Sequence, residues 1–129
     1  MQVLFTGLWN KYNGAGGAAL KAVVSGMYFT EAPQGTAYPY IVYHKISGVA
    51  DYTYTEDMEN VIIQFNIYDD NSSSTTINDI YTKLTALYDW CALSVSPWNS
   101  IYMRRELDNL TRDNGVWNYM ISYRLEIQK

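Results

Sequence analysis

Several residue types are scarce in this chain of 129 residues, and each shortage excludes a class of protein. A single cysteine, Cys91, allows neither an intrachain disulfide nor a cysteine metal site. Nine basic against thirteen acidic residues give a net charge of −4, which argues against a sequence-independent nucleic-acid binder because such proteins need a basic face. The apolar start, Met1–Trp9, reaches Asn10 and Lys11 too soon for a membrane span. We therefore expect one domain over residues 1–129, made in the cytoplasm without membrane contact.

The chain also lacks the residue sets that catalysis and cofactor binding require. Its only histidine, His44, lies in a predicted strand, and a structural role is favoured because no Ser-His-Asp or Cys-His set can be built around it. The glycine-rich stretch 13–17 has no Gly-Lys-Ser/Thr ending, so it predicts a hinge rather than a phosphate loop. The acidic pairs 56–57 and 69–70 have no indicated partners for a metal. The sequence therefore predicts no enzyme, no metal site and no cofactor.

Aromatic residues are abundant, with 13 tyrosines and 4 tryptophans. So many phenol rings cannot all lie in a core of this size, and tyrosine supplies contact area at little entropic cost. The composition indicates a surface that binds another protein.

The stretch Val61–Tyr68 is the most regular strand pattern in the chain. Alternate residues from Val61 to Ile67 are apolar, which predicts one buried face, while Ile62 and Tyr68 lie on a more polar outer face. The segment 76–90 has apolar residues at helical spacing and should pack on the buried face. We expect Ile62 and Tyr68 to be exposed in an isolated subunit and covered in an assembly.

Further strands are predicted at 27–29 and 40–46, and short helices before the first of them. The segment 47–58 is rich in tyrosine and threonine but has no apolar stripe, so it predicts a protruding, mobile connection or an extended hairpin. The predicted fold is α+β in two layers, an antiparallel sheet of about four main strands with the 76–90 helix on one face.

The last thirty residues predict a hairpin around Asn114-Gly115. A three-residue loop brings one apolar face together and places Arg105 across from Tyr123, where its guanidinium can stack on the ring. It also sets Arg104 against Arg124, a repulsion that nearby glutamates, Glu106 and Glu126, would relieve. The pairs this register predicts are Ile101 with Ile127, Met103 with Leu125, Leu107 with Ile121 and Thr111 with Trp117.

The order of these features resembles that of a known family. The segments Gly-Met-Tyr-Phe-Thr-Glu-Ala-Pro-Gln-Gly (26–35), Pro-Tyr-Ile-Val-Tyr (39–43) and Val-Ile-Ile-Gln-Phe-Asn-Ile-Tyr (61–68) are similar to the tail-completion, or head–tail joining, proteins of long-tailed bacteriophages. A helix with Leu84 and Leu87 and a closing strand through Tyr-Arg-Leu-Glu-Ile (123–127) complete the resemblance.

The resemblance implies a non-enzymatic protein of the virion neck with a tail-terminator-like fold, assembled in the host cytoplasm. It implies a ring, expected to be a hexamer, that associates by sheet edges and aromatic contacts, caps the tail tube and binds the head connector. DNA would pass through the lumen without specific binding. The candidate assembly residues are Tyr52, Tyr54, Ile62, Tyr68, Arg104 and Arg124.

Two alternatives remain open at the level of sequence. One is a carbohydrate- or small-ligand-binding module in which Trp9, Trp90, Trp98 or Trp117 stacks on the ligand. The other is a small α+β enzyme that uses His44 with a nearby carboxylate.

Overall fold

A computed structural model describes residues 2–52, 57–93 and 95–128. Its elements are α1 (Gln2–Asn13), a 3-10 turn (Ala15–Gly17), α2 (Ala18–Lys21), β1 (Met27–Phe29), β2 (Tyr40–Tyr52), β3 (Asp57–Asp69), α3 (Thr75–Tyr88), β4 (Asn99–Asp113) and β5 (Val116–Gln128).

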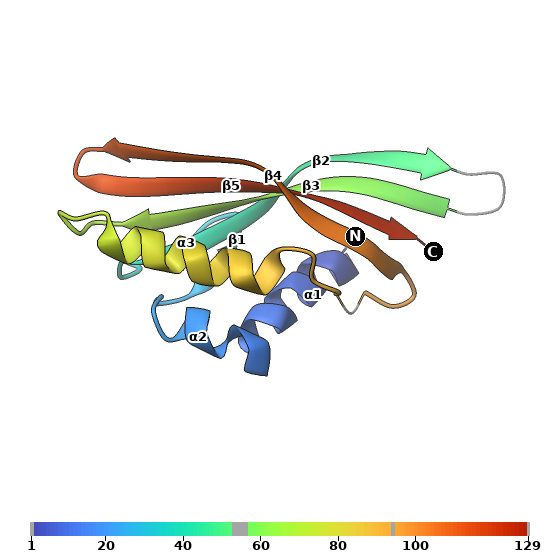
Figure 1. Ribbon diagram of the computed structural model, residues 1–129, viewed down its shortest axis with the longest axis horizontal. Helices are drawn as coiled ribbons and strands as arrows, with labels where there is room; N and C mark the ends of the chain where they lie inside the picture. Colours follow the sequence, from blue (N-terminus) through green and yellow to red (C-terminus); the bar gives the residue numbers. More distant parts are fainter. Residues whose placement is uncertain (1, 53–56, 94, 129) are drawn as a thin grey trace.

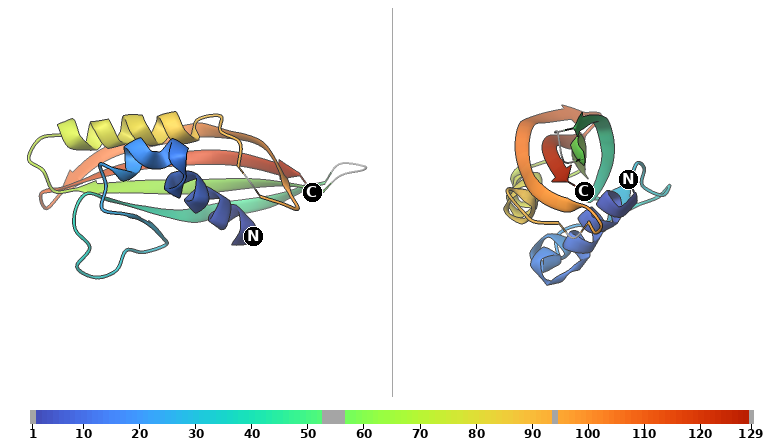
Figure 2. Two further views of the ribbon diagram at one scale, coloured as in Figure 1. Left: turned by 90° about the horizontal axis from the view of Figure 1, so that it is seen from below. Right: turned by 90° about the vertical axis from the view of Figure 1, so that its right-hand side faces the viewer.

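The strands form one five-stranded sheet in the order β1-β2-β3-β5-β4. β1 is parallel to β2, and the four long strands β2 to β5 pair antiparallel. The helices lie on one face of this sheet, which is strongly twisted and curled when seen from its end (Figures 1 and 2). The predicted α+β class with two layers is confirmed, and β1 is the short strand predicted at 27–29 beside the four main strands.

The core lies between β3 and the helices, as the alternation of apolar residues predicts. Val61, Ile63, Phe65 and Ile67 are all fully buried. Helix α3 contributes buried residues at helical spacing, and it ends two residues earlier than predicted. The centre is aromatic, because the Phe65 ring lies 4.8 Å from the Tyr88 ring, centroid to centroid.

The N-terminal helices are confirmed, and the glycine-rich stretch lies between them as predicted. Leu4, Leu8 and Tyr12 are the buried side chains of α1. The Tyr88 hydroxyl donates a 2.7 Å hydrogen bond to the Leu8 carbonyl, which ties α3 to α1 inside the core. No phosphate loop is present here, since the stretch 15–17 is a 3-10 turn between two helices and not a strand-to-helix loop.

The segment 47–58 is predicted to be either a mobile connection or an extended hairpin. Much of it extends the β2–β3 hairpin. β2 continues to Tyr52 and β3 begins at Asp57, and the two ends pair. A β-bulge at Ile46 precedes this extension, since Lys45 pairs with Ile63 and Ser47 with Ile62. This arm runs to the end of the sheet opposite the β4–β5 turn (Figure 1).

The predicted register of the β4–β5 hairpin is wrong near the turn and correct in its middle. Asp113 lies opposite Val116, so the loop has two residues, and both Asn114 (φ 50°) and Gly115 (φ 78°) have the positive φ of a type I′ turn. Such a turn matches the twist of the strands, which outweighs the match of apolar faces near the loop. The pairs next to the turn are therefore Arg112 with Trp117 and Asp108 with Ile121.

Two β-bulges in β4 then shift the register. The first, at Glu106, restores the predicted pairs Arg105 with Tyr123 and Met103 with Leu125. The second, at Ile101, places Ser100 opposite Ile127. The hairpin thus satisfies both the turn and the apolar face by placing extra residues in one strand.

Candidate assembly surfaces

The face of the sheet opposite the helices carries three of the six predicted assembly residues in one row. Ile62 of β3 lies opposite Arg124 of β5, and Arg124 lies opposite Arg104 of β4. Ile62 and Arg124 are half-buried, and Arg104 is exposed. The expectation that Ile62 and Tyr68 are exposed in the isolated chain is only partly met, because neighbouring strands shield both to intermediate exposure.

Glu106 neutralises the two arginines of this row. Its Oε1 accepts a 2.7 Å hydrogen bond from Arg124 Nε and lies 3.2 Å from Arg104 Nη2. The hydrogen bond from Arg124 lowers the pKa of the Glu106 carboxyl. The predicted relief of the repulsion between Arg104 and Arg124 is confirmed for Glu106, whose place in a bulge the sequence does not reveal.

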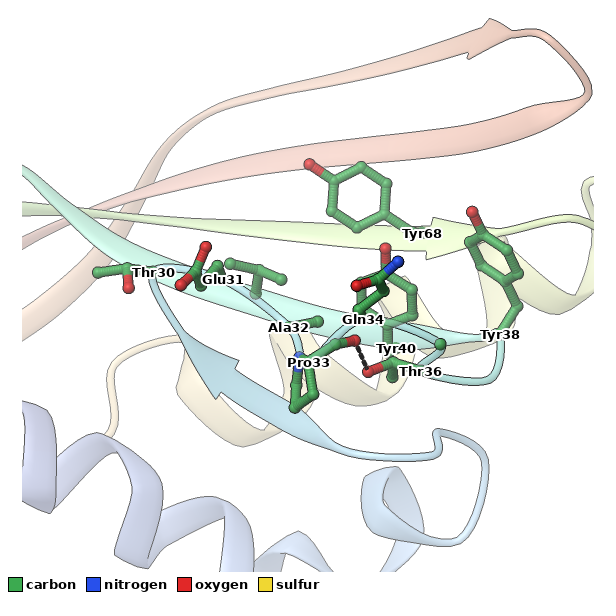
Figure 3. A pocket seen from close by; sticks show the side chains of 11 residues that line it. Thr30, Glu31, Ala32, Pro33, Gln34, Thr36, Tyr38, Tyr40 and Tyr68 are labelled. Atoms are coloured by element: carbon green, nitrogen blue, oxygen red, sulfur yellow. Dashed lines mark hydrogen bonds between the residues drawn. The ribbon is translucent and has the colours of Figure 1, made fainter.

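Tyr68 lies apart from this row, in a groove lined by aromatic residues (Figure 3). The groove has a volume of about 550 Å³ between the outer face of β2 and β3 and the loop 30–36. The Tyr38 and Tyr40 rings stack with centroids 5.3 Å apart, and Tyr68 lies 5.3 Å from Tyr40. Burial raises the pKa of the Tyr40 and Tyr68 phenols, so they remain neutral donors at physiological pH. We call this groove, which Tyr38, Tyr40 and Tyr68 line together with the loop 30–36, the tyrosine groove.

One of the two remaining predicted residues, Tyr52, lies at the far end of the β2–β3 arm. Tyr52 ends β2 opposite Asp57, and Tyr54 lies outside the described residues. The five candidates that the structure describes therefore form no single patch. Sequence reasoning missed Tyr38 and Tyr40, although the pattern Tyr-Pro-Tyr at 38–40 places two rings beside a fixed turn and was available as a signal.

The tryptophans do not build a shared stacking platform. Trp9 is 41% exposed and Trp90 71% exposed. Trp98 and Trp117 are partly buried and pack against the core. The Trp117 indole donates to the Asn71 carbonyl at 3.0 Å, and Arg112 lies over its ring. The arrangement gives no support to a carbohydrate site that uses these four rings.

The residues with catalytic potential are also dispersed. His44 is half-buried in β2, opposite Gln64. Burial raises the pKa of the Cys91 thiol to about 11, so it stays protonated and is a poor nucleophile at neutral pH. Across the described part of the chain, no three His, Cys, Asp or Glu side chains are grouped to hold a metal ion. No helix in the same residues has the length and apolar character needed to cross a membrane.

A polar network joins the end of α3 to the sheet. The Tyr123 hydroxyl, fully buried on β5, donates to Asp89 Oδ1 at 2.6 Å, and Arg105 Nη2 lies 3.5 Å from Asp89 Oδ2. The Arg105 guanidinium lies over the Tyr81 ring of α3, near its ion pair with Asp89, and not over the Tyr123 ring that the sequence predicts. Burial and the hydrogen bond to Asp108 raise the pKa of Tyr81 to about 12.

Asp89→Ala is expected to lower the free energy of unfolding by about 2 kcal/mol, because it leaves the buried Tyr123 hydroxyl without an acceptor. Urea unfolding followed by circular dichroism measures this loss. The matched control is Asp79→Ala, whose exposed carboxylate pairs with Lys83 and should cost about 0.5 kcal/mol or less. If Asp89→Ala costs as much in a Tyr123→Phe background as in the native chain, the hydroxyl is not the cause.

The described surface carries an aromatic groove and an arginine row bridged by Glu106, features that suit contact with another protein. Comparison with known families agrees. The model of the family described as Tail completion protein gp17 matches residues 15–118, and the chain belongs to this family. It is therefore a structural virion protein with a role in completing a bacteriophage tail, as the sequence resemblance implies.

Solved structures extend the likeness of fold over nearly the whole chain. A chain from the virion of a native gene transfer agent (GTA) particle has a TM-score of 0.84 at 11% identity, over 96% of this chain and 93% of that one. A second structure has a TM-score of 0.62 at 11% identity, over 99% of this chain and 95% of the other. No curated protein sequence matches.

Proposed function

We propose that this chain, as one domain over residues 1–129, forms a ring on the end of the tail tube and joins the completed tail to the head. The observation that carries the proposal is the division of the sheet into two faces. One is covered by helices, and the other presents the Ile62–Arg124–Arg104 row and the tyrosine groove to a partner. Family membership supports the tail-completion part of this role.

The proposed ring is a closed head-to-tail assembly. Copies of one chain that associate head to tail close into a ring when the rotation between them divides a full turn, and we propose six copies. One rim of the ring would bind tube subunits and the other the head connector. Half-buried tyrosines suit such contacts because they bury area with few rotatable bonds.

DNA would cross the lumen without adhering to it. The chain has a net charge of −4, and its outer-face arginines are bridged by Glu106. The described part of that face therefore has no row of unpaired basic side chains to bind the phosphates of DNA.

The experiment uses tails purified from particles that lack this protein. Adding the purified chain should place about six copies on each tail end and restore joining to filled heads, counted by electron microscopy. Tyr68→Ala together with Arg124→Glu should reduce joining, because one change opens the groove and the other repels Glu106. The control is Thr82→Asp on the exposed side of α3. A native chain that neither binds tube ends nor restores joining would refute the proposal.

A further inference from the structure

The tyrosine groove presents three aromatic rings in succession. Tyr38, Tyr40 and Tyr68 line it, with both neighbouring pairs of ring centroids 5.3 Å apart (Figure 3). Tyr38 is 39% exposed, so a partner can reach the rings. Burial and the neighbouring Tyr38 phenol raise the pKa of both Tyr40 and Tyr68, so the phenols lie close together and stay protonated. The groove therefore offers ring faces and neutral hydroxyl oxygens in one place.

The only charged side chain among the described residues that line the groove is acidic. It belongs to Glu31 on the loop 30–36, which is exposed and makes no ion pair within the described part of the chain. The other polar side chains of the loop, Thr30, Gln34 and Thr36, are uncharged. A carboxylate with no basic group beside it in the lining favours a ligand of positive charge.

The backbone that carries Glu31 is held in place. Thr30, which precedes it, has a φ of 65°, a left-handed value that is rare for a β-branched residue. The Thr30 N–H donates to the Tyr43 carbonyl at 2.8 Å, and the Glu31 N–H donates to the Phe29 carbonyl at 2.8 Å. These bonds tie the start of the loop to β2 and β1. The carboxylate thus projects from an ordered main chain, and binding need not order it.

Ring faces beside a carboxylate suit an arginine side chain. The face of a tyrosine ring attracts a cation. A guanidinium is planar, so it can lie against a ring while its N–H groups donate to carboxylate and hydroxyl oxygens, whereas a lysine ammonium is a compact and strongly hydrated charge. The same combination occurs within this chain, where the Arg105 guanidinium lies 5.6 Å from the Tyr81 ring centroid and pairs with Asp89.

The arginines of a second copy are already engaged. Each of the four in the sequence contacts groups of its own chain: Arg104 and Arg124 pair with Glu106, Arg105 pairs with Asp89, and Arg112 donates to the carbonyls of Asn71 and Ser72. A second copy would have to break one of these contacts to fill the groove. The groove therefore fits an arginine of a different protein.

We propose that the tyrosine groove binds an arginine side chain of a neighbouring virion protein, with the guanidinium against the tyrosine rings and paired with Glu31. The inference rests on the proposed joining function and names the chemistry by which this face recognises its partner. Arginine is enriched at protein interfaces, as is tyrosine. The volume of about 550 Å³ leaves room for the residues that flank the arginine.

The first test titrates the native chain with N-acetyl-arginine amide and follows two-dimensional amide NMR spectra. Shifts should concentrate in residues 30–42 and at Tyr68. N-acetyl-citrulline amide has nearly the same shape without the charge, and at matched ionic strength it should cause no comparable shifts. Equal shifts with the two probes, or none in the groove with the arginine probe, would overturn the inference.

Two variants remove the two parts of the site. Glu31→Gln removes the charge at an exposed position, and Tyr38→Leu removes one ring face but keeps an apolar side chain. Each should weaken binding of the arginine probe about fivefold. The matched controls are Tyr38→Phe, which keeps the ring face, and Asp79→Asn, which removes an exposed carboxylate on α3. Both controls should bind the probe as the native chain does.

The same variants are then added to tails that lack this protein. Glu31→Gln and Tyr38→Leu should restore joining to heads less well than the native chain, and the two controls should restore it fully. If Glu31→Gln joins heads as well as the native chain, the partner does not use an arginine here, and the inference fails while the joining function stands. If the native chain itself restores no joining, the proposed function fails, and the titration alone decides whether the groove binds arginine.

Discussion

Replacing Phe65 by alanine is expected to lower the free energy of unfolding by about 3–5 kcal/mol. The side chain is fully buried at the centre of β3. Three tyrosine rings surround it, Tyr43, Tyr88 and Tyr123, with centroid distances of 6.0, 4.8 and 5.8 Å. All three hydroxyls donate hydrogen bonds, Tyr43 to the Phe5 carbonyl, Tyr88 to the Leu8 carbonyl and Tyr123 to Asp89, so the rings cannot move in to fill the cavity.

Urea unfolding followed by tryptophan fluorescence measures this loss. Ile62→Ala is the control on the same strand, since its side chain lies on the uncovered face and is half-buried. Its cost should stay near 1 kcal/mol, below the range for fully buried aliphatic residues. Equal costs at the two positions would mean that the faces of β3 are buried to the same extent, which contradicts the two-layer arrangement.

Gly17→Ala is expected to cost about 3 kcal/mol, near the upper end for overpacking. A Cβ atom at this position would lie 1.9 Å from the Tyr12 carbonyl oxygen and 2.8 Å from that of Lys11. Both are backbone atoms of α1, so neither can turn aside as a side chain would. The glycine is required by the close approach and not by its φ of −91°, which other residues can adopt.

The neighbouring glycine provides the control. At Gly16 the nearest atom to a Cβ is Leu87 Cδ1 at 3.8 Å, an ordinary contact. Gly16→Ala should therefore change the free energy of unfolding by about 0.5 kcal/mol or less. Thermal unfolding of both variants separates the two cases, and a Gly17→Ala protein as stable as the native one would show that α1 and α2 are not tightly joined here.

The sequence predicts the fold wherever one physical signal dominates a segment. The alternation from Val61 to Ile67 identifies β3 and its buried face, since a strand with one buried face must alternate. The spacing of apolar residues in 76–90 identifies α3. The outer part of the β2–β3 arm gives a weaker signal, because residues there have no apolar stripe and are ordered by backbone pairing, to which side chains contribute little.

The bulges are the features that sequence reasoning could not supply. Whether Glu106 interrupts β4 depends on the balance between the geometry of the Asn114-Gly115 turn and the match of Met103 with Leu125, two requirements separated by ten residues. Each predicts its own register, and a bulge satisfies both. Arg105 contacts Tyr81 and Asp89 at α3, tertiary contacts that no local pattern predicts, and the expected stacking on Tyr123 is not found.

Of the candidate surfaces, the sequence indicates residues of the arginine row but not the groove, because the groove depends on contacts between distant segments. Ile62, Arg104 and Arg124 share a row because strand pairing follows from face matching. The tyrosine groove requires the loop 30–36 to approach the sheet. Such approaches depend on tertiary packing, which no local pattern encodes.

The bulges of β4 also bear on how chains of this fold can differ in length. Arg105 and Leu107 pair with consecutive residues of β5, Tyr123 and Ser122, so a chain without Glu106 would keep an unbroken ladder and the same partners. Gain or loss of a single residue at this position is thus neutral for the side chains that face the helices. Alignments with relatives as distant as 11% identity should place a one-residue gap here. The buried positions on both sides of the gap should stay aligned with their counterparts.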